Sequence, residues 1–314
     1  MLGGSPEHAS GGPLTCGRSH NRRLVDAATT EDTNPPISRR TTALGLPPLG
    51  DYLSEAFRYR TFAWYWSKAD IKARNFETVL GRAWHVLNPL LFGVIYFIFV
   101  GILAGGLGDA ERLALIVGNL YVWMFFSGTI TTGVGTIQNA AAGLLSQSAI
   151  PRVVLPFASA ISSVNLFLRS LIAYVPIHFL AQRGIHIEML WIPVLIVITS
   201  LFGFGLSLLF AVLNVYIRDI SRLLPHALRL WLYLSPAIWE YTQVLGPSTL
   251  EMIARWNPMF SGMTAWTIAF GGPLEAGGPS IVGQIGVFTA WAIGAVIVGF
   301  LIFVAREDDF AVRN

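Results

Sequence analysis

The sequence predicts an all-α polytopic membrane protein with six transmembrane helices. Only 12% of the 314 residues are charged, against about 25% in soluble domains, and the mean hydropathy is +0.58. Residues 86–305 hold just 15 of the 39 charges, too few to cover a globular core with polar surface. A soluble enzyme and a nucleic-acid-binding protein are therefore excluded, although the sequence pI is about 9.2.

Six apolar runs are long enough to cross a bilayer, which takes about 20 residues. Four contain no charge, and two contain one arginine each, Arg169 and Arg229. The second run exceeds one span, but its second half is rich in Gly, Gln and Asn, so we expect one helix followed by a loop. The runs are residues 83–108, 113–151, 153–182, 189–217, 223–239 and 276–305.

The positive residues place both termini in the cytoplasm. With this orientation 16 of the 21 Lys and Arg residues lie inside, three lie outside and two lie within spans. The expected organisation has four parts. These are a disordered cytoplasmic tail at 1–48, an amphipathic inner-leaflet segment at 49–85, the six-span domain at 86–305 and a cytoplasmic C-terminal tail at 306–314.

Two further helical elements are expected beside the spans. Leu53, Phe57 and Trp64 recur at helical spacing in a segment rich in aromatic and basic residues, which is typical of a helix in the headgroup layer. A soluble amphipathic helix is the alternative. Between spans five and six, Pro and Gly bracket the apolar centre of residues 256–274, which predicts short re-entrant helices at the outer face.

The spans lack the groups that ion coupling needs. They contain no deep Asp, Glu or Lys. Arg169 lies near the midplane, and its guanidinium cannot cycle a proton. A structural role for Arg169, with Asn165 one turn away, and a role in transport are both open.

No catalytic or nucleotide-binding motif occurs in the sequence. There is no metal-binding histidine pair, no nucleophile elbow and no phosphate-binding Gly–Lys loop. We therefore expect a protein that is not an enzyme and holds no metal or cofactor. If it performs active transport, another subunit must supply the energy.

Several motifs occur in order along the cytoplasmic and outer segments. Together, over residues 51–305, they resemble the signatures of type-2 ABC export permeases, and most closely those of the polysaccharide and teichoic-acid exporters. Ala69 and Asn75 depart from the pattern, because the family often has Arg and Tyr there. The motifs are residues 70–74, 80–84, 87–90, 150–156, 218–220, 235–236 and 257–258.

The resemblance implies a homodimer in the bacterial inner membrane with two ABC nucleotide-binding subunits, which would bind ATP and Mg²⁺. The implied cargo is a polysaccharide linked to a polyprenyl diphosphate, moved from the cytoplasmic to the outer leaflet. The sequence has 19 Arg and only two Lys, which suggests a high-GC bacterium. In such an organism, cell-wall galactan is one candidate for the cargo. The alternatives are a lipid or drug ABC exporter, an ion-coupled flippase and a membrane glycosyltransferase.

The resemblance also assigns an ATPase-coupling region to the loop after span two, with a short coupling helix, and to the turn after span four. An ordinary proline-rich connection is the alternative. The residues expected to contact the ATPase are Leu144, Leu145, Ala149, Ile150, Pro151, Arg152, Arg218 and Asp219.

Two groups of residues are expected to meet the substrate. Aromatic rings can stack on the apolar faces of sugars, although interfacial aromatics are also common in membrane proteins. Basic residues at the inner leaflet could receive the diphosphate, or form only a positive-inside collar. The channel candidates are Phe92, Tyr96, Phe99, Trp123, Phe126, Arg169, Trp231 and Tyr233. The headgroup candidates are Lys68, Lys72, Arg74 and Arg82.

Overall fold

The computed structural model describes seven stretches of the chain, all within one compact unit, Ile37–Asn314. Throughout these stretches the regular structure is helical and no strand occurs, which confirms the predicted all-α class. The described residues are 48–74, 83–103, 110–141, 150–181, 184–239, 256–272 and 280–307.

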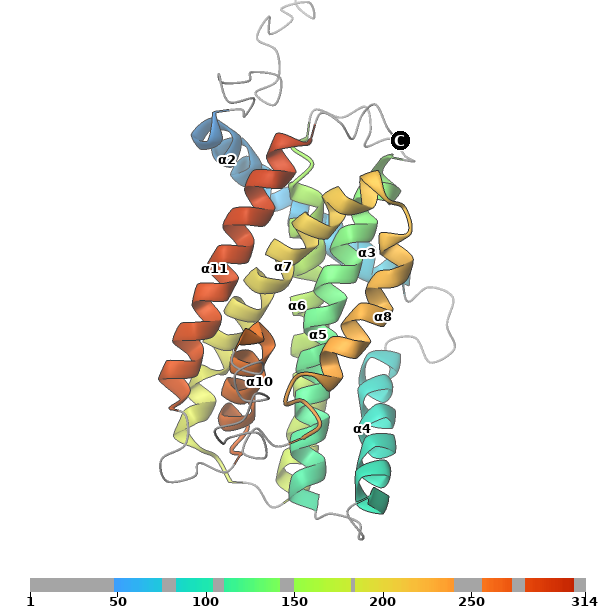
Figure 1. Cartoon of the computed structure of the whole chain (residues 1–314), viewed down its shortest axis with the longest axis vertical. Helices are drawn as coiled ribbons and strands as arrows, with labels where there is room; N and C mark the ends of the chain where they lie inside the picture. Colours follow the sequence, from blue (N-terminus) through green and yellow to red (C-terminus); the bar gives the residue numbers. More distant parts are fainter. Residues whose placement is uncertain are drawn as a thin grey trace, which may run out of the picture. The chain divides into compact units, whose positions relative to one another are not determined.

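Ten helices make up this part of the chain (Figure 1). They are α2 (Leu49–Arg58), α3 (Arg60–Arg74), α4 (Trp84–Leu103), α5 (Ala110–Ala141), α6 (Val154–Leu180), the 3₁₀ helix η4 (Ile187–Trp191), α7 (Ile192–Tyr216), α8 (Ile220–Tyr233), α10 (Pro258–Ala269) and α11 (Ile281–Ala305).

Four segments of the described residues are long and apolar enough to cross a membrane. They are Glu111–Ile137, Val154–Leu180, Ile187–Tyr216 and Ile281–Ala305. The expected first and fifth spans correspond to α4 and α8. Since α8 has only 14 residues, it is about 21 Å long and shorter than a hydrocarbon layer of about 30 Å. The count of six spans therefore stays a prediction.

Helix α5 lies at the centre of the bundle. It packs against α4, α6, α7, α8 and α10, and Figure 1 shows it with α8 on one side and α7 on the other. Most of its apolar residues are buried, and Ala114, Val122, Phe126 and Ile130 have no exposed surface. Met124, Ser127 and Thr131 are half-exposed, so α5 also keeps one partly open face.

Aromatic rings of α5 contact α7 and α8, and a ring of α7 contacts α11. The ring of Phe126 stacks on Phe202 of α7 at 5.4 Å and meets Trp231 of α8 edge-on at 5.5 Å. Phe202 in turn contacts Phe288 of α11 at 5.5 Å, and Trp123 contacts Trp231 at 6.3 Å. We call these five residues the aromatic cluster. Each such pair contributes about 0.5–1.5 kcal/mol beyond the burial of its surface.

Helices α7 and α11 touch through glycine. A Cβ atom on Gly205 would lie 2.5 Å from the backbone of Ala295, and one on Gly299 would overlap the carbonyl of Gly205. Small residues allow this close approach, which favours van der Waals packing between membrane helices. The two helices make the most extensive contact in the bundle.

Segments predicted to be cytoplasmic meet at one end of the bundle. Glu307, just after α11, contacts both Tyr52 of α2 and Arg152 before α6. Its neighbour Arg306 contacts Tyr216 at the end of α7. The sequence assigns residues 306–314 to a tail, whereas the first two of these residues pack against the bundle.

The glycine contact predicts that alanine destabilises the protein at Gly299 of α11 but not at Gly294 of the same helix. Gly299→Ala should destabilise the protein by about 1–3 kcal/mol, because its methyl group pushes α11 away from α7. Gly294→Ala is the matched control, since no atom lies within 4 Å of its added Cβ. Thermal unfolding in detergent, followed by tryptophan fluorescence, measures both. Equal unfolding temperatures for the two variants would contradict the close contact.

Candidate functional site

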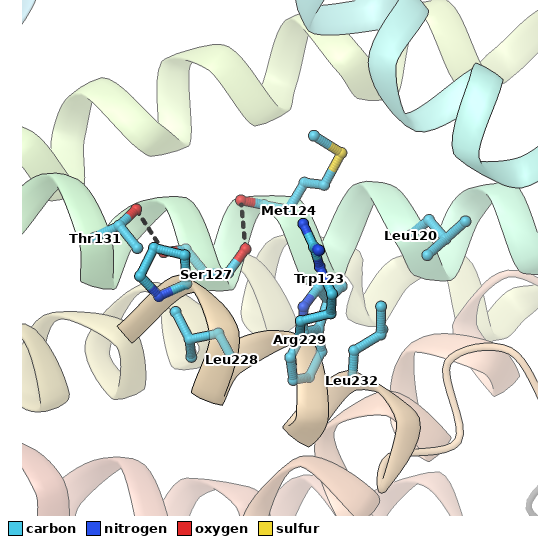
Figure 2. Close-up of a pocket in the computed structure, with 9 residues that line it drawn as sticks. Leu120, Trp123, Met124, Ser127, Thr131, Leu228, Arg229 and Leu232 are labelled. Carbon is cyan, nitrogen blue, oxygen red and sulfur yellow. Dashed lines mark hydrogen bonds between the residues drawn. The ribbon is translucent and has the colours of Figure 1, made fainter. Parts of the chain in front are cut away.

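A groove of about 190 Å³ lies between α5 and α8 (Figure 2). Most of its lining is apolar, with two hydroxyl groups and one guanidinium. The lining residues are Leu120, Trp123, Met124, Ser127 and Thr131 of α5, and Pro225, Leu228, Arg229 and Leu232 of α8.

Helical periodicity explains how α8 forms one wall of the groove. Leu224, Leu228 and Leu232 recur every four residues and are buried against the bundle. Pro225 and Arg229 each follow one position later, so they lie at the edge of this buried stripe. Most other residues of α8 are exposed in this chain, including Leu230, whereas Trp231 is half-buried.

The two hydroxyl groups on the α5 wall donate hydrogen bonds to backbone carbonyls of the same helix. Ser127 donates to the carbonyl of Met124 at 3.4 Å, and Thr131 donates to the carbonyl of Ser127 at 3.0 Å. These bonds use the hydroxyl protons and leave the oxygen lone pairs as acceptors. The wall can therefore accept hydrogen bonds from hydroxyl groups of a ligand.

Arg229 is the one charged residue that lines the groove. Its side chain extends from α8 toward α5 beside Trp123 and Met124 (Figure 2). Among the residues that the structure describes, no carboxylate forms an ion pair with it. A guanidinium binds phosphate in a bidentate geometry, so this position suits an anionic ligand. Sequence reasoning noted Arg229 inside a span but omitted it from the site.

The predicted channel aromatics lie in different environments. Trp123 lines the groove, whereas Phe126 has no exposed surface and packs the core within the aromatic cluster. Trp231 is half-buried in that cluster, and Tyr233 is exposed at the end of α8. Neither lines the groove. The side chains of Phe92, Tyr96 and Phe99 lie outside the described residues.

Arg169 is exposed on α6 and does not line the groove. Its proposed neighbour Asn165 donates its amide to the carbonyl of Ile161 at 3.0 Å. Ile172, on the same exposed face, is 72% exposed. In this chain Arg169 therefore belongs to an outward face of α6 and not to the α5–α8 groove.

A second cavity, of about 280 Å³, lies on another side of α5, between α4, α5 and α6. Its lining includes several polar groups, among them the amide of Asn88 of α4 and the hydroxyls of Thr132, Ser162 and Ser170. Met124 lines both this cavity and the groove.

Asn257 joins the end of α8 to the start of α10. Its Oδ1 accepts from the indole of Trp231 at 2.7 Å and from the backbone N–H of Met259 at 3.0 Å, which caps α10. Its Nδ2 donates to the carbonyl of Leu234 at 3.0 Å and to the hydroxyl of Ser235 at 3.1 Å. The Ser-Pro and Asn-Pro motifs thus meet in space, and Asn257 fixes the position of a cluster ring.

The cytoplasmic turns predicted to contact an ATPase are described in part. Pro151 is buried and Arg152 half-buried, whereas Arg218 and Asp219 are exposed. Asp219 forms an exposed ion pair with Arg222 at 3.9 Å, and such pairs contribute little stability. Leu144, Leu145 and Ala149 lie outside the described residues. The contact of these turns with an ATPase stays a prediction.

The turn before α8 is fixed by a buried amide. Asn214 accepts the backbone N–H of Ser221 at 3.0 Å through its Oδ1. This bond satisfies one of the amide groups that a helix leaves unpaired at its start. It holds the exposed Arg218 and Asp219 at the end of the bundle.

The headgroup candidates lie on α3 or beyond it. Lys68 places its ammonium 5.0 Å from the ring centre of Trp64, a cation–π contact, and Lys72 is exposed. The side chain of Arg74, and Arg82, lie outside the described residues. No group of three or more His, Cys, Asp or Glu residues gathers as a metal site in the described stretches.

Comparison with known proteins identifies the class. Residues 63–270 match the family model of the ABC-2 type transporter, so this chain belongs to that family. It is 27% identical over 202 residues to the O-antigen export system permease protein RfbA of Klebsiella pneumoniae, covering 64% of this chain and 76% of the relative. The permease of that name from Myxococcus xanthus is 24% identical over 264 residues, covering 82% and 96%. The predicted family is confirmed.

The bonds of Asn257 predict a specific loss of stability. Asn257→Ala should cost about 1–3 kcal/mol, because it leaves the Trp231 indole and the Leu234 carbonyl without this partner. Ser280→Ala removes only the single cap bond to Gly283 of α11 and should cost about 1 kcal/mol. Thermal unfolding compares the two variants. A smaller loss for Asn257→Ala than for Ser280→Ala would refute the joining role.

Proposed function

We propose that the chain is the membrane subunit of an ATP-driven exporter that moves a polysaccharide on a polyprenyl diphosphate carrier from the cytoplasmic to the outer leaflet. Membership of the ABC-2 type transporter family and similarity to O-antigen export permeases support this proposal. The observation that carries it is the groove in which Arg229 lies beside Trp123. Cell-wall galactan is one candidate cargo.

The groove combines two kinds of recognition that such a cargo needs. The groove offers sugars an apolar wall of leucine and methionine side chains, while Trp123 at its edge is only 4% exposed and is covered mainly by the aromatic cluster. The guanidinium of Arg229 offers charge-assisted bonds to a phosphate. Because neither contact requires a particular sugar, successive repeating units could pass the same residues.

The groove is open to one side, and we propose that a second copy of the chain faces it in a homodimer. Two ATPase subunits would dock at the end where the α5–α6 loop and the α7–α8 turn lie. This chain has no phosphate-binding loop, so ATP and Mg²⁺ would bind to those subunits.

Transport in inverted membrane vesicles tests this function. The permease is co-expressed with a candidate partner ABC ATPase, and the movement of radiolabelled lipid-linked glycan to the lumenal side of the vesicles is followed after ATP addition. We expect uptake that requires ATP and persists with a protonophore. Uptake that the protonophore abolishes would support an ion-coupled flippase, and movement of carrier lipid without glycan would support a lipid exporter.

Substitution of Arg229 tests the groove itself. Arg229→Gln should lower the initial rate of glycan uptake about tenfold, the value of one charge-assisted hydrogen bond. Arg229→Lys should retain more activity, because it keeps the charge. Leu230→Ala, on the exposed side of α8, is the control and should remain near wild type. Equal uptake by Arg229→Gln and Leu230→Ala would remove Arg229 from the transport path.

Arg169, unlike Arg229, does not line the groove, so its substitution should have a smaller effect on uptake. Arg169→Leu should keep the uptake rate within about twofold of wild type, provided that the complex assembles. Size-exclusion chromatography checks assembly and the vesicle assay checks uptake. Loss of uptake by a normally assembled variant would assign Arg169 a role in transport.

A further inference from the structure

Glu307 is a buried carboxylate at the end of α11. Only 8% of its surface is exposed, and both of its oxygens accept hydrogen bonds from distant parts of the chain. Oε2 accepts from the hydroxyl of Tyr52 at 2.7 Å, and Oε1 accepts from the backbone N–H of Arg152 at 2.8 Å. A buried carboxylate is costly unless it is bonded in this way, so these contacts are specific to the folded arrangement.

Arg152, whose backbone N–H donates to Glu307, lies directly before Val153, the N-cap residue of α6. The first amide groups of a helix have no partner within the helix, and an anion near them is favoured by the helix dipole. Val154 begins α6 and donates to the carbonyl of Pro151 at 3.0 Å, which closes the turn around Arg152. The carboxylate of Glu307 therefore holds the last turn of the α5–α6 loop.

Tyr52 secures the other oxygen of Glu307. The ring of Tyr52 has no exposed surface and packs edge-on against Phe300 of α11 at 5.9 Å. Burial and the neighbouring Glu307 carboxylate raise the pKa of Tyr52 above its ordinary value. The phenol consequently keeps its proton and acts as the donor in this bond.

Arg306 makes the corresponding contact with the second cytoplasmic turn. Its Nη1 donates to the hydroxyl of Tyr216 at 3.2 Å, and its guanidinium lies 6.0 Å from the centre of the Tyr216 ring. Tyr216 is the last residue of α7, directly before the turn that contains Arg218 and Asp219. Two consecutive residues thus contact Arg152 in one turn and Tyr216 directly before the other, the two turns that the family resemblance assigns to the ATPase.

We propose that Glu307 is a positioning residue for the α5–α6 loop, holding its last turn against α2 and α11 so that ATPase movement at the loop is passed to the helices. This inference rests on the proposed function. Glu307 would contact neither nucleotide nor glycan. Its effect would be on the number of glycans moved for each ATP hydrolysed.

Two variants separate the hydrogen bonds from the packing. Tyr52→Phe keeps the ring against Phe300 and removes the donor, whereas Glu307→Gln keeps the side-chain shape and replaces one acceptor oxygen with an amide NH₂. The controls are Tyr65→Phe, on an exposed position of α3, and Glu188→Gln in η4.

Hydrogen exchange of the purified full-length permease in nanodiscs tests the contact without any ATPase. We expect faster exchange in the peptide that contains Arg152 for Glu307→Gln and Tyr52→Phe, and no change for either control. The permease–ATPase complex is then assayed for glycan uptake and ATP hydrolysis in parallel. We expect the ratio of uptake to hydrolysis to fall about five- to tenfold for Glu307→Gln and less for Tyr52→Phe.

The outcomes distinguish the Glu307 contacts, the positioning role and the proposed function. Unchanged exchange in both variants would overturn the contact, and faster exchange with a wild-type ratio would overturn the positioning role. An equal loss of uptake and hydrolysis would also overturn it, because it indicates impaired assembly. Absence of ATP-driven uptake by the wild type would refute the proposed function, while the exchange result would still report on the Glu307 contacts.

Discussion

The packing of α5 among five other helices is the constraint on which the other elements depend. Helices α4, α6, α7, α8 and α10 cover most of its surface, and the stretch from Met124 to Thr132 keeps a half-exposed face at the two cavities. The aromatic cluster then constrains the rotation of α5 relative to α7 and α8, since Phe126 contacts both Phe202 and Trp231. Both cavities described above lie along this one helix, so its packing also determines where a ligand can enter the bundle.

Much of the fold could be predicted because helix length and hydropathy reflect the thickness of the bilayer. Helix-breaking proline and glycine predict a short helix between Asn257-Pro258 and Gly271-Gly272, and α10 runs there from Pro258 to Ala269. The direction of a side chain is harder to predict. Trp123 and Phe126 both suit a channel wall by residue type, yet only Trp123 reaches the groove, because helix rotation is set by tertiary contacts.

The residues that sequence reasoning missed have partners far away in the chain. Glu307 follows the last apolar run and looks like the first charge of a solvated tail, but its partners are 155 and 255 residues away. Asn257 belongs to a sequence motif, whereas its bonds to Trp231 and Ser235 depend on the packing of the end of α8 against the start of α10. Arg229 did carry a signal, because a charge inside an apolar run is costly and usually functional.

The 14 residues of α8 also matter for the surrounding lipid. A bilayer in direct contact with so short a helix would have to thin by about 9 Å, and each ångström of mismatch costs a fraction of a kcal/mol. Burying Arg229 in undisturbed acyl chains would add to this cost. The energetic penalty falls away where another protein surface or water replaces lipid along α8. Hydrophobic mismatch and the cost of placing Arg229 in acyl chains thus disfavour an α8 that faces lipid and favour one that faces another protein surface or water.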